Sequence, residues 1–167
     1  MKLFFFVIFI SSCTITLSQK VTNGSLCLLF HQVETEEDLE QLLSHQEKVN
    51  NNISNAYFGS AIAMKAQYAF SPIKKLDYFK DGTKLIEASI DNSKEIENIY
   101  LRLIIQLNTP HFLGYYKNIN EDITFISNNV DSSPLTKKWK VTFLENLMLF
   151  ETEDYDFSSI KDKLVNY

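Results

Sequence analysis

The amino-acid sequence predicts an all-α fold, built from six to eight helices that pack as antiparallel hairpins in one helical bundle domain. The chain has only four glycines and three prolines in 167 residues, which is too few for a β-sandwich with its many turns. Every proline follows a serine or threonine, a pair that suits the start of a helix. The clearest helical spacing of apolar residues runs along one segment: Ile96, Ile99, Tyr100, Leu103, Ile104 and Leu107.

Two export signals compete at the start of the chain. Lys2 and the apolar run Leu3–Ile10 have the form of a secretory signal, and the run is too short to span a bilayer. Ile10-Ser11-Ser12-Cys13 matches a lipobox, which would make Cys13 the lipid-modified first residue of a bacterial lipoprotein. Thr16-Leu17-Ser18 before Gln19 matches a signal peptidase I site instead.

We favour cleavage after Ser18, so that residues 1–18 are a signal peptide and residues 19–167 form a single all-helical domain. The protein is then exported, either periplasmic or secreted, with no transmembrane helix in the mature chain. The alternative is a membrane-anchored lipoprotein held by a lipid on Cys13. By either route Cys27 has no partner for a disulfide, and we expect it to be buried in the core.

In the N-terminal half, capping residues predict where helices begin and apolar spacing predicts which face is buried. Thr35 followed by three acids marks one start. Residues 54–70 mix small and aromatic residues with little polar surface, so we expect this helix at the centre, where its small residues let neighbours approach. Ser71-Pro72 begins a helix over residues 72–90, and Gly82 within it offers a point of close packing. The apolar stripe of that helix is Leu76, Phe79, Ile86 and Ile90.

In the C-terminal half, the predicted helix starts are Thr109-Pro110, a capping box of Asn118 with Glu121, and Ser133-Pro134. The residues from 139 to 143 fit either a strand or a helix, and the upstream proline favours a helix. Glu151–Phe157 predicts an acidic turn before a short terminal helix that ends near Val165.

One stretch carries resemblances to known families. The segment FKDGTKLIEASIDNSKEIENIYLRLIIQ resembles two adjoining helices of tetratricopeptide-type repeats, although the Trp-Leu-Gly-Tyr positions of that repeat are not matched. The longer pattern SPIKKLDYFKDGTKLIEASI with IYLRLIIQLNTPHFLGYYKNINED resembles an uncharacterised family of small signal-bearing Bacteroidota proteins. This resemblance covers roughly residues 56–130 and implies an exported, all-helical protein with tetratricopeptide-like hairpins. It implies no catalytic residue.

The candidate contact surface is the loop between the two best-defined helices. It holds His111, Phe112, Tyr115 and Tyr116, and loops carry function more often than cores do. The plainer interpretation is that its apolar residues plug the end of the bundle. His111 has no second histidine or carboxylate at ligand or relay spacing, so we assign no catalytic residue, no cofactor-binding residue and no metal ligand.

Charge and composition narrow the function classes. A net charge of −5 argues against a nucleic-acid partner, because phosphate binding needs a concentrated basic face. Arg102 is the only arginine beside many Lys, Asn and Ile, a composition typical of an AT-rich genome, so we assign it no function. We expect an exported interaction or structural module that binds an unknown protein partner; an enzyme is the least supported class. The alternative is a small-ligand binder, which predicts a pocket of about 300 Å³ or more. Its expected lining is Tyr57, Tyr68, Phe79 and Tyr100.

Overall fold

The computed structural model describes residues 22–151 and 154–167, so the two export signals and Cys13 lie outside the described residues. The described part of the chain is all-α, as predicted. It contains eight α-helices and two 3-10 helices, which are α1 (Asn23–Phe30), α2 (Glu36–Leu43), α3 (Asn52–Met64), η1 (Lys65–Gln67), α4 (Pro72–Asn92), α5 (Ile96–Leu107), η2 (His111–Leu113), α6 (Ile119–Asn129), α7 (Lys137–Met148) and α8 (Ser158–Val165).

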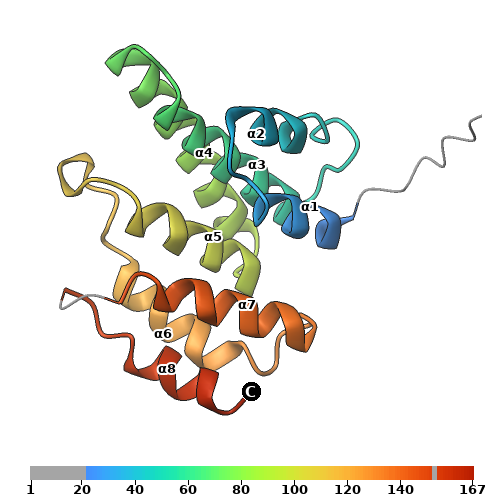
Figure 1. Ribbon diagram of the computed structural model, residues 1–167, viewed down its shortest axis with the longest axis vertical. Helices are drawn as coiled ribbons and strands as arrows, with labels where there is room; N and C mark the ends of the chain where they lie inside the picture. The colour runs from blue at the N-terminus through green and yellow to red at the C-terminus, as the bar shows by residue number, and fades with distance from the viewer. Residues whose placement is uncertain (1–21, 152–153) are drawn as a thin grey trace, which may run out of the picture.

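The helices are stacked along the long axis of the molecule (Figure 1). Helices α2, α3 and α4 form one end, α6, α7 and α8 form the other, and α5 lies between them. Most side chains of α5 are therefore buried, including Ile99 and Leu103 of the predicted stripe. The segment from 139 to 143 is helical and belongs to α7. Cys27 is buried, as predicted.

Helices α3 and α4 cross at two glycines. The amide of Asn52 donates to the Ser89 carbonyl at 2.7 Å, so the start of α3 lies against the end of α4 and the pair is antiparallel. A Cβ atom added to Gly82 would lie 2.4 Å from the Gly59 carbonyl oxygen, and one added to Gly59 would lie 2.7 Å from the Gly82 carbonyl oxygen. Only glycine permits this approach, which confirms the predicted close packing at Gly82.

Two predicted helix starts are confirmed, although only the first has a side-chain capping contact. Thr35 and Asp38 form a complete capping box at the start of α2, and Pro72 is the first residue of α4. The helix predicted over residues 54–70 is central but ends sooner, at Met64, and continues only as η1. Ser71, which precedes Pro72, is extended, so the helix does not run on into α4.

Asn118 is the N-cap residue of α6, so the predicted start is right, but its side chain makes no capping hydrogen bond. Two other predicted starts are wrong. Thr109-Pro110 leads only into η2, and α7 begins three residues after Pro134, where Thr136 caps it. In the last two cases the hydroxyl turns back: Thr109 donates to the Ile105 carbonyl at 2.6 Å and Ser133 to the Val130 carbonyl at 2.7 Å. These side chains therefore close the preceding helix instead of opening the next.

A buried ion pair joins three helices. The guanidinium of Arg102 on α5 donates to both carboxylate oxygens of Asp122 on α6, at 2.8 and 2.6 Å, and to Glu87 on α4 at 3.0 Å. The Tyr115 hydroxyl donates to the other Glu87 oxygen at 2.6 Å. Arg102 therefore has a structural role, which was not predicted from the sequence because this residue was explained by composition.

Candidate functional site

The described residues enclose a cavity of about 850 Å³. It lies between the N-terminal half of α4 and α5, with the ends of α1 and α7 and the η2 turn completing its wall. Its volume falls in the range that binds small molecules in proteins. Most of the wall is apolar, and the large side chains include Phe30, Met64, Leu76, Phe79, Ile104 and Phe150.

The cavity results from unequal helix lengths. Helix α4 has 21 residues and α5 has 12, which correspond to about 31 Å and about 18 Å at 1.5 Å per residue. The N-terminal half of α4 therefore extends past its neighbours (Figure 1), and α4 is longer than every other helix of the described residues. Helical spacing turns Leu76 and Phe79 of α4 and Tyr100 and Ile104 of α5 toward the space that remains.

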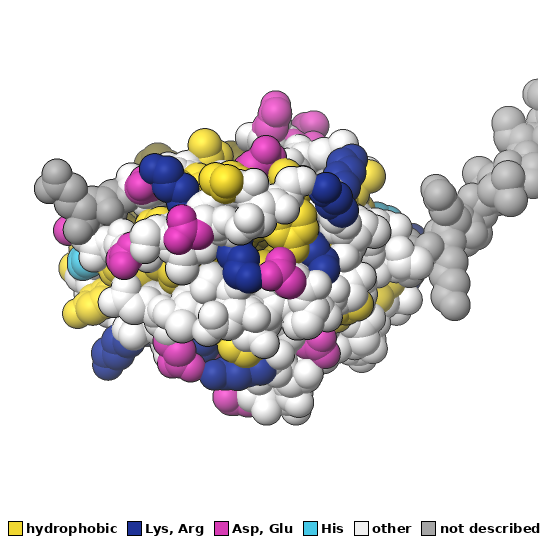
Figure 2. Space-filling view, turned by 90° about the horizontal axis from the view of Figure 1, so that it is seen from below, with side chains coloured by type: hydrophobic (Ala, Val, Ile, Leu, Met, Phe, Trp, Pro, Cys, Tyr) yellow, Lys and Arg dark blue, Asp and Glu magenta, His cyan; other side chains and the backbone are white. Residues whose placement is uncertain are grey.

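The mouth of the cavity carries exposed apolar side chains. Phe112 in η2 is 86% exposed and Leu149 after α7 is 81% exposed, and both line the cavity. Phe70 and Ile73, on either side of the lining residue Pro72, are also exposed. By contrast, the end of the molecule that contains α8 shows acidic and basic side chains interspersed (Figure 2). Exposed apolar residues gathered at one opening are typical of a binding site.

Three polar side chains in the wall form a continuous hydrogen-bonded chain. The Nδ1 atom of His31 lies 2.7 Å from the Cys27 carbonyl oxygen, which can only accept, so Nδ1 carries the proton. Nε2 then accepts from the Tyr100 hydroxyl at 3.0 Å, and the Asn146 amide donates to that same hydroxyl at 3.0 Å. The network of these three side chains carries no charge, and each of its hydrogen bonds joins a donor to an acceptor.

Aromatic packing holds this chain in place. The Tyr100 ring stacks on Phe143, with ring centroids 3.8 Å apart, and the His31 ring lies parallel to both. Burial lowers the pKa of His31 and raises the pKa of Tyr100, so both side chains are neutral at pH 7. His31 and Tyr100 have used their N–H and O–H donors within this network, so a ligand can accept from the second N–H of Asn146 and donate to the Asn146 side-chain carbonyl oxygen or the Tyr100 hydroxyl oxygen. None of these groups is a strong acid or base.

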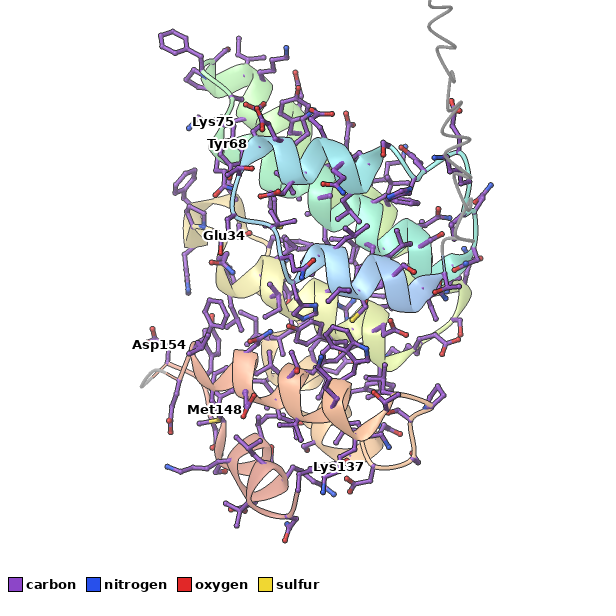
Figure 3. The ribbon with its side chains drawn as sticks, turned by 45° about the vertical axis from the view of Figure 1, so that its right-hand side comes forward. Glu34, Tyr68, Lys75, Lys137, Met148 and Asp154 are labelled. Carbon is purple, nitrogen blue, oxygen red and sulfur yellow. The ribbon has the colours of Figure 1, made fainter. Side chains whose placement is uncertain are left out.

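The charge at the cavity comes from one lysine. Lys75 is exposed and lines the cavity, and no described Asp or Glu lines it. Among the described residues, no carboxylate forms an ion pair with Lys75. Figure 3 places Lys75 on the same side of the molecule as Tyr68 and Glu34, and neither of these lines the cavity. The cavity is therefore apolar, with one positive charge at its opening.

The structure places only part of the predicted contact loop at the cavity. Phe112 lines the cavity, whereas the exposed His111 ring stacks on Tyr116 outside it, with centroids 4.9 Å apart. The Tyr155 hydroxyl lies 3.4 Å from His111 Nε2. Tyr115 turns away toward Glu87. Only Phe112 of the four predicted residues therefore belongs to the site.

The lining expected for a ligand binder is also present only in part. Phe79 and Tyr100 line the cavity. Tyr57 is fully buried and donates to Glu97 at 2.8 Å, and the Tyr68 hydroxyl lies 3.3 Å from the Glu34 carbonyl oxygen at the surface. Lys75, His31 and Asn146 were not predicted, because they come from three different helices and share no spacing in the sequence.

Other kinds of site were sought in the same residues. The described part of the chain has no group of three or more His, Cys, Asp or Glu side chains placed to hold a metal ion. None of its helices is both long and apolar enough to cross a membrane. No family model, curated protein or solved structure matches the chain. The cavity and its lining residues therefore provide the basis for a functional assignment.

Proposed function

We propose that this protein binds an apolar small molecule in the cavity between α4 and α5. The observation that carries the proposal is an open space of about 850 Å³ with a mainly apolar wall and a few convergent polar groups. Such a wall stabilises a ligand by removing its apolar surface from water, at about 25 cal/mol per Å². The neutral chain of His31, Tyr100 and Asn146 supplies the polar contacts that orient a ligand.

A neutral fluorescent probe tests this function directly. N-phenyl-1-naphthylamine should show a saturable rise in fluorescence with the wild-type protein. Ala66 lines the cavity at η1, so Ala66→Phe should fill part of the space and weaken binding. Ala88→Phe is the matched control, because Ala88 is an exposed residue of α4 that does not line the cavity.

Circular dichroism of both variants should show the wild-type helix content. Equal probe affinity in Ala66→Phe and the wild type, or no saturable binding to the wild type, would contradict a ligand site in this cavity.

A second candidate is the interaction module, and the exposed apolar residues beside the cavity mouth favour it. Phe70 and Ile73 project from the start of α4 and do not line the cavity. The double variant F70S/I73S should therefore lose a protein partner while keeping the wild-type affinity for the neutral probe. Loss of probe affinity together with the partner would indicate that the two surfaces are one site.

We also propose that the protein acts outside the cytoplasm. This proposal is supported by the signal pattern of residues 1–18 and by the resemblance to signal-bearing Bacteroidota proteins. Mass spectrometry of the mature protein should find Gln19 as the first residue. A lipid-modified Cys13 would instead identify an anchored lipoprotein, and an intact Met1 would contradict export.

A further inference from the structure

We infer that the natural ligand is an amphiphile with a single carboxylate end, which pairs with Lys75 while its apolar part fills the cavity. This inference rests on the proposed function and names the class of ligand. It follows from the charges around the opening, from the partners of the neighbouring lysines and from the polarity of the wall.

Two other lysines near the start of α4 have partners, whereas Lys75 has no ion pair with a described residue. Lys65 forms an ion pair with Glu40, and its ammonium also lies 5.2 Å from the centre of the Tyr78 ring. Lys74 lies 6.0 Å from the centre of that same ring. Lys75 has no ion pair with a described carboxylate and is the lysine that borders the cavity. Its charge is available to a ligand.

Among the described residues, no acidic side chain in the cavity wall neutralises the positive charge of Lys75. No described carboxylate lines the wall, and polar residues that do line it, such as Gln67, Asn108 and Thr109, carry neutral amides and hydroxyls. A positive charge beside a low-dielectric wall attracts anions and repels cations. A ligand with a carboxylate end can therefore meet Lys75 in water at the opening while its apolar part leaves water. An amphiphile with a cationic end would bring two like charges together.

The depth of the site fits the same orientation. Phe79 lies four residues after Lys75 and three after Leu76 along α4, so it is the neighbour of both on the helix surface, and all three line the cavity. Ile104 and Tyr100 face them from α5. An apolar chain anchored at Lys75 thus runs inward between these side chains. Its far end reaches the wall that contains His31 and Asn146, where no charge is needed.

Three amphiphiles with the same twelve-carbon chain test the inference: dodecanoate, dodecanol and dodecyltrimethylammonium. Each is used below the concentration at which it forms micelles, to displace N-phenyl-1-naphthylamine from the full mature chain. We expect dodecanoate to compete about two- to fivefold better than dodecanol, which is the size of an exposed ion pair. Dodecyltrimethylammonium should compete worst. The preference for dodecanoate should shrink as salt is raised.

Two lysine variants isolate the contact. Lys75→Gln should remove the preference for dodecanoate and leave dodecanol unchanged, and Lys75→Glu should make dodecyltrimethylammonium the best competitor. Lys74→Gln is the matched control with the same loss of charge on the same turn, and it should keep the wild-type order.

The outcomes separate this inference from the proposed function. Equal competition by the three compounds, or an unchanged order in Lys75→Gln, overturns the carboxylate assignment while ligand binding stands. Failure of the neutral probe to bind the wild type overturns both. Binding to anionic phospholipid vesicles without displacement of the probe also overturns the inference, because the charge would then serve a membrane surface.

Discussion

The Nε2 atom of His31 lies 3.0 Å from the hydroxyl oxygen of Tyr100, although 69 residues separate the two in the chain. His31 follows the last residue of α1, and Tyr100 lies in the middle of α5. Asn146 on α7 donates to the same hydroxyl. One hydroxyl group therefore connects three helices at the wall of the cavity, and the protonation of His31 affects both stability and the site.

The position of His31 predicts a pH dependence of stability. An unfolded histidine takes up a proton as the pH falls through about 6.5, but burial lowers the pKa of His31 in the folded protein. The unfolded state therefore binds more protons just below pH 6.5, and the free energy of unfolding falls as the pH drops. His31→Asn should remove this contribution, so its urea midpoint should change less between pH 7.5 and 5.5 than that of the wild type.

The other groups around His31 do not titrate in this window. Burial raises the pKa of Cys27 to about 12 and also raises that of Tyr100. Carboxylates elsewhere affect both proteins alike, so the difference between the two curves isolates His31. His111→Asn, at an exposed ring, is the matched control. Parallel curves for the wild type and His31→Asn would show that His31 is not responsible.

The helices could be predicted from the sequence because their causes are local. The spacing of Ile99 and Leu103 follows the helical period, and the capping box of Thr35 with Asp38 lies within four residues. Thr109 and Ser133 were misassigned because a hydroxyl between two helices can serve either one. Which helix the hydroxyl bonds to depends on the direction of the chain after the first helix, and tertiary packing sets that direction.

Only Phe79, Tyr100 and Phe112 of the site were predicted from the sequence, because the cavity is a tertiary feature. It exists where a long α4 extends past a short α5. The helix predicted over residues 72–90 ends within two residues of the observed end of α4, but the space beside it depends on how the other helices pack. Lys75 looks in the sequence like any surface lysine. Only the ion pair of its neighbour Lys65 and the absence of lining carboxylates among the described residues distinguish it.

The crossing of α3 and α4 predicts that Gly82 cannot be enlarged. In a helix interior, alanine in place of glycine is expected to stabilise the helix by about 1 kcal/mol. At Gly82, however, its Cβ atom would lie 2.4 Å from backbone atoms of Gly59 and Ala63. We expect Gly82→Ala to lower the free energy of unfolding by about 1–3 kcal/mol, as overpacking does. Chemical denaturation measures it.

Gly24 provides the matched control for this substitution. Its added Cβ atom would meet only the Thr22 hydroxyl, at 3.7 Å, so Gly24→Ala should raise stability by at most about 1 kcal/mol. If Gly82→Ala were as stable as Gly24→Ala, the helices would not be in backbone contact.

The apolar stripe of α5 predicts a large cost for truncating Leu103. This side chain is fully buried, so Leu103→Ala should lower the free energy of unfolding by about 2–5 kcal/mol. Leu149→Ala removes the same atoms from an exposed position and should change stability by less than about 0.5 kcal/mol. Similar denaturant midpoints for the two variants would mean that Leu103 does not face the core.

Because Arg102 and Asp122 form a buried ion pair, we expect the loss of either side chain alone to destabilise the fold. Both side chains are almost fully buried, so Asp122→Ala leaves a guanidinium without its main partner in the interior. We expect a loss of about 3–5 kcal/mol in the free energy of unfolding. Lys94→Gln breaks the exposed pair with Glu121 and should cost less than about 1 kcal/mol. Arg102→Lys should also lower the free energy of unfolding, because an ammonium cannot donate along the two parallel bonds that the guanidinium makes. If Asp122→Ala and Lys94→Gln had equal unfolding midpoints, the buried pair would not hold α5 against α6.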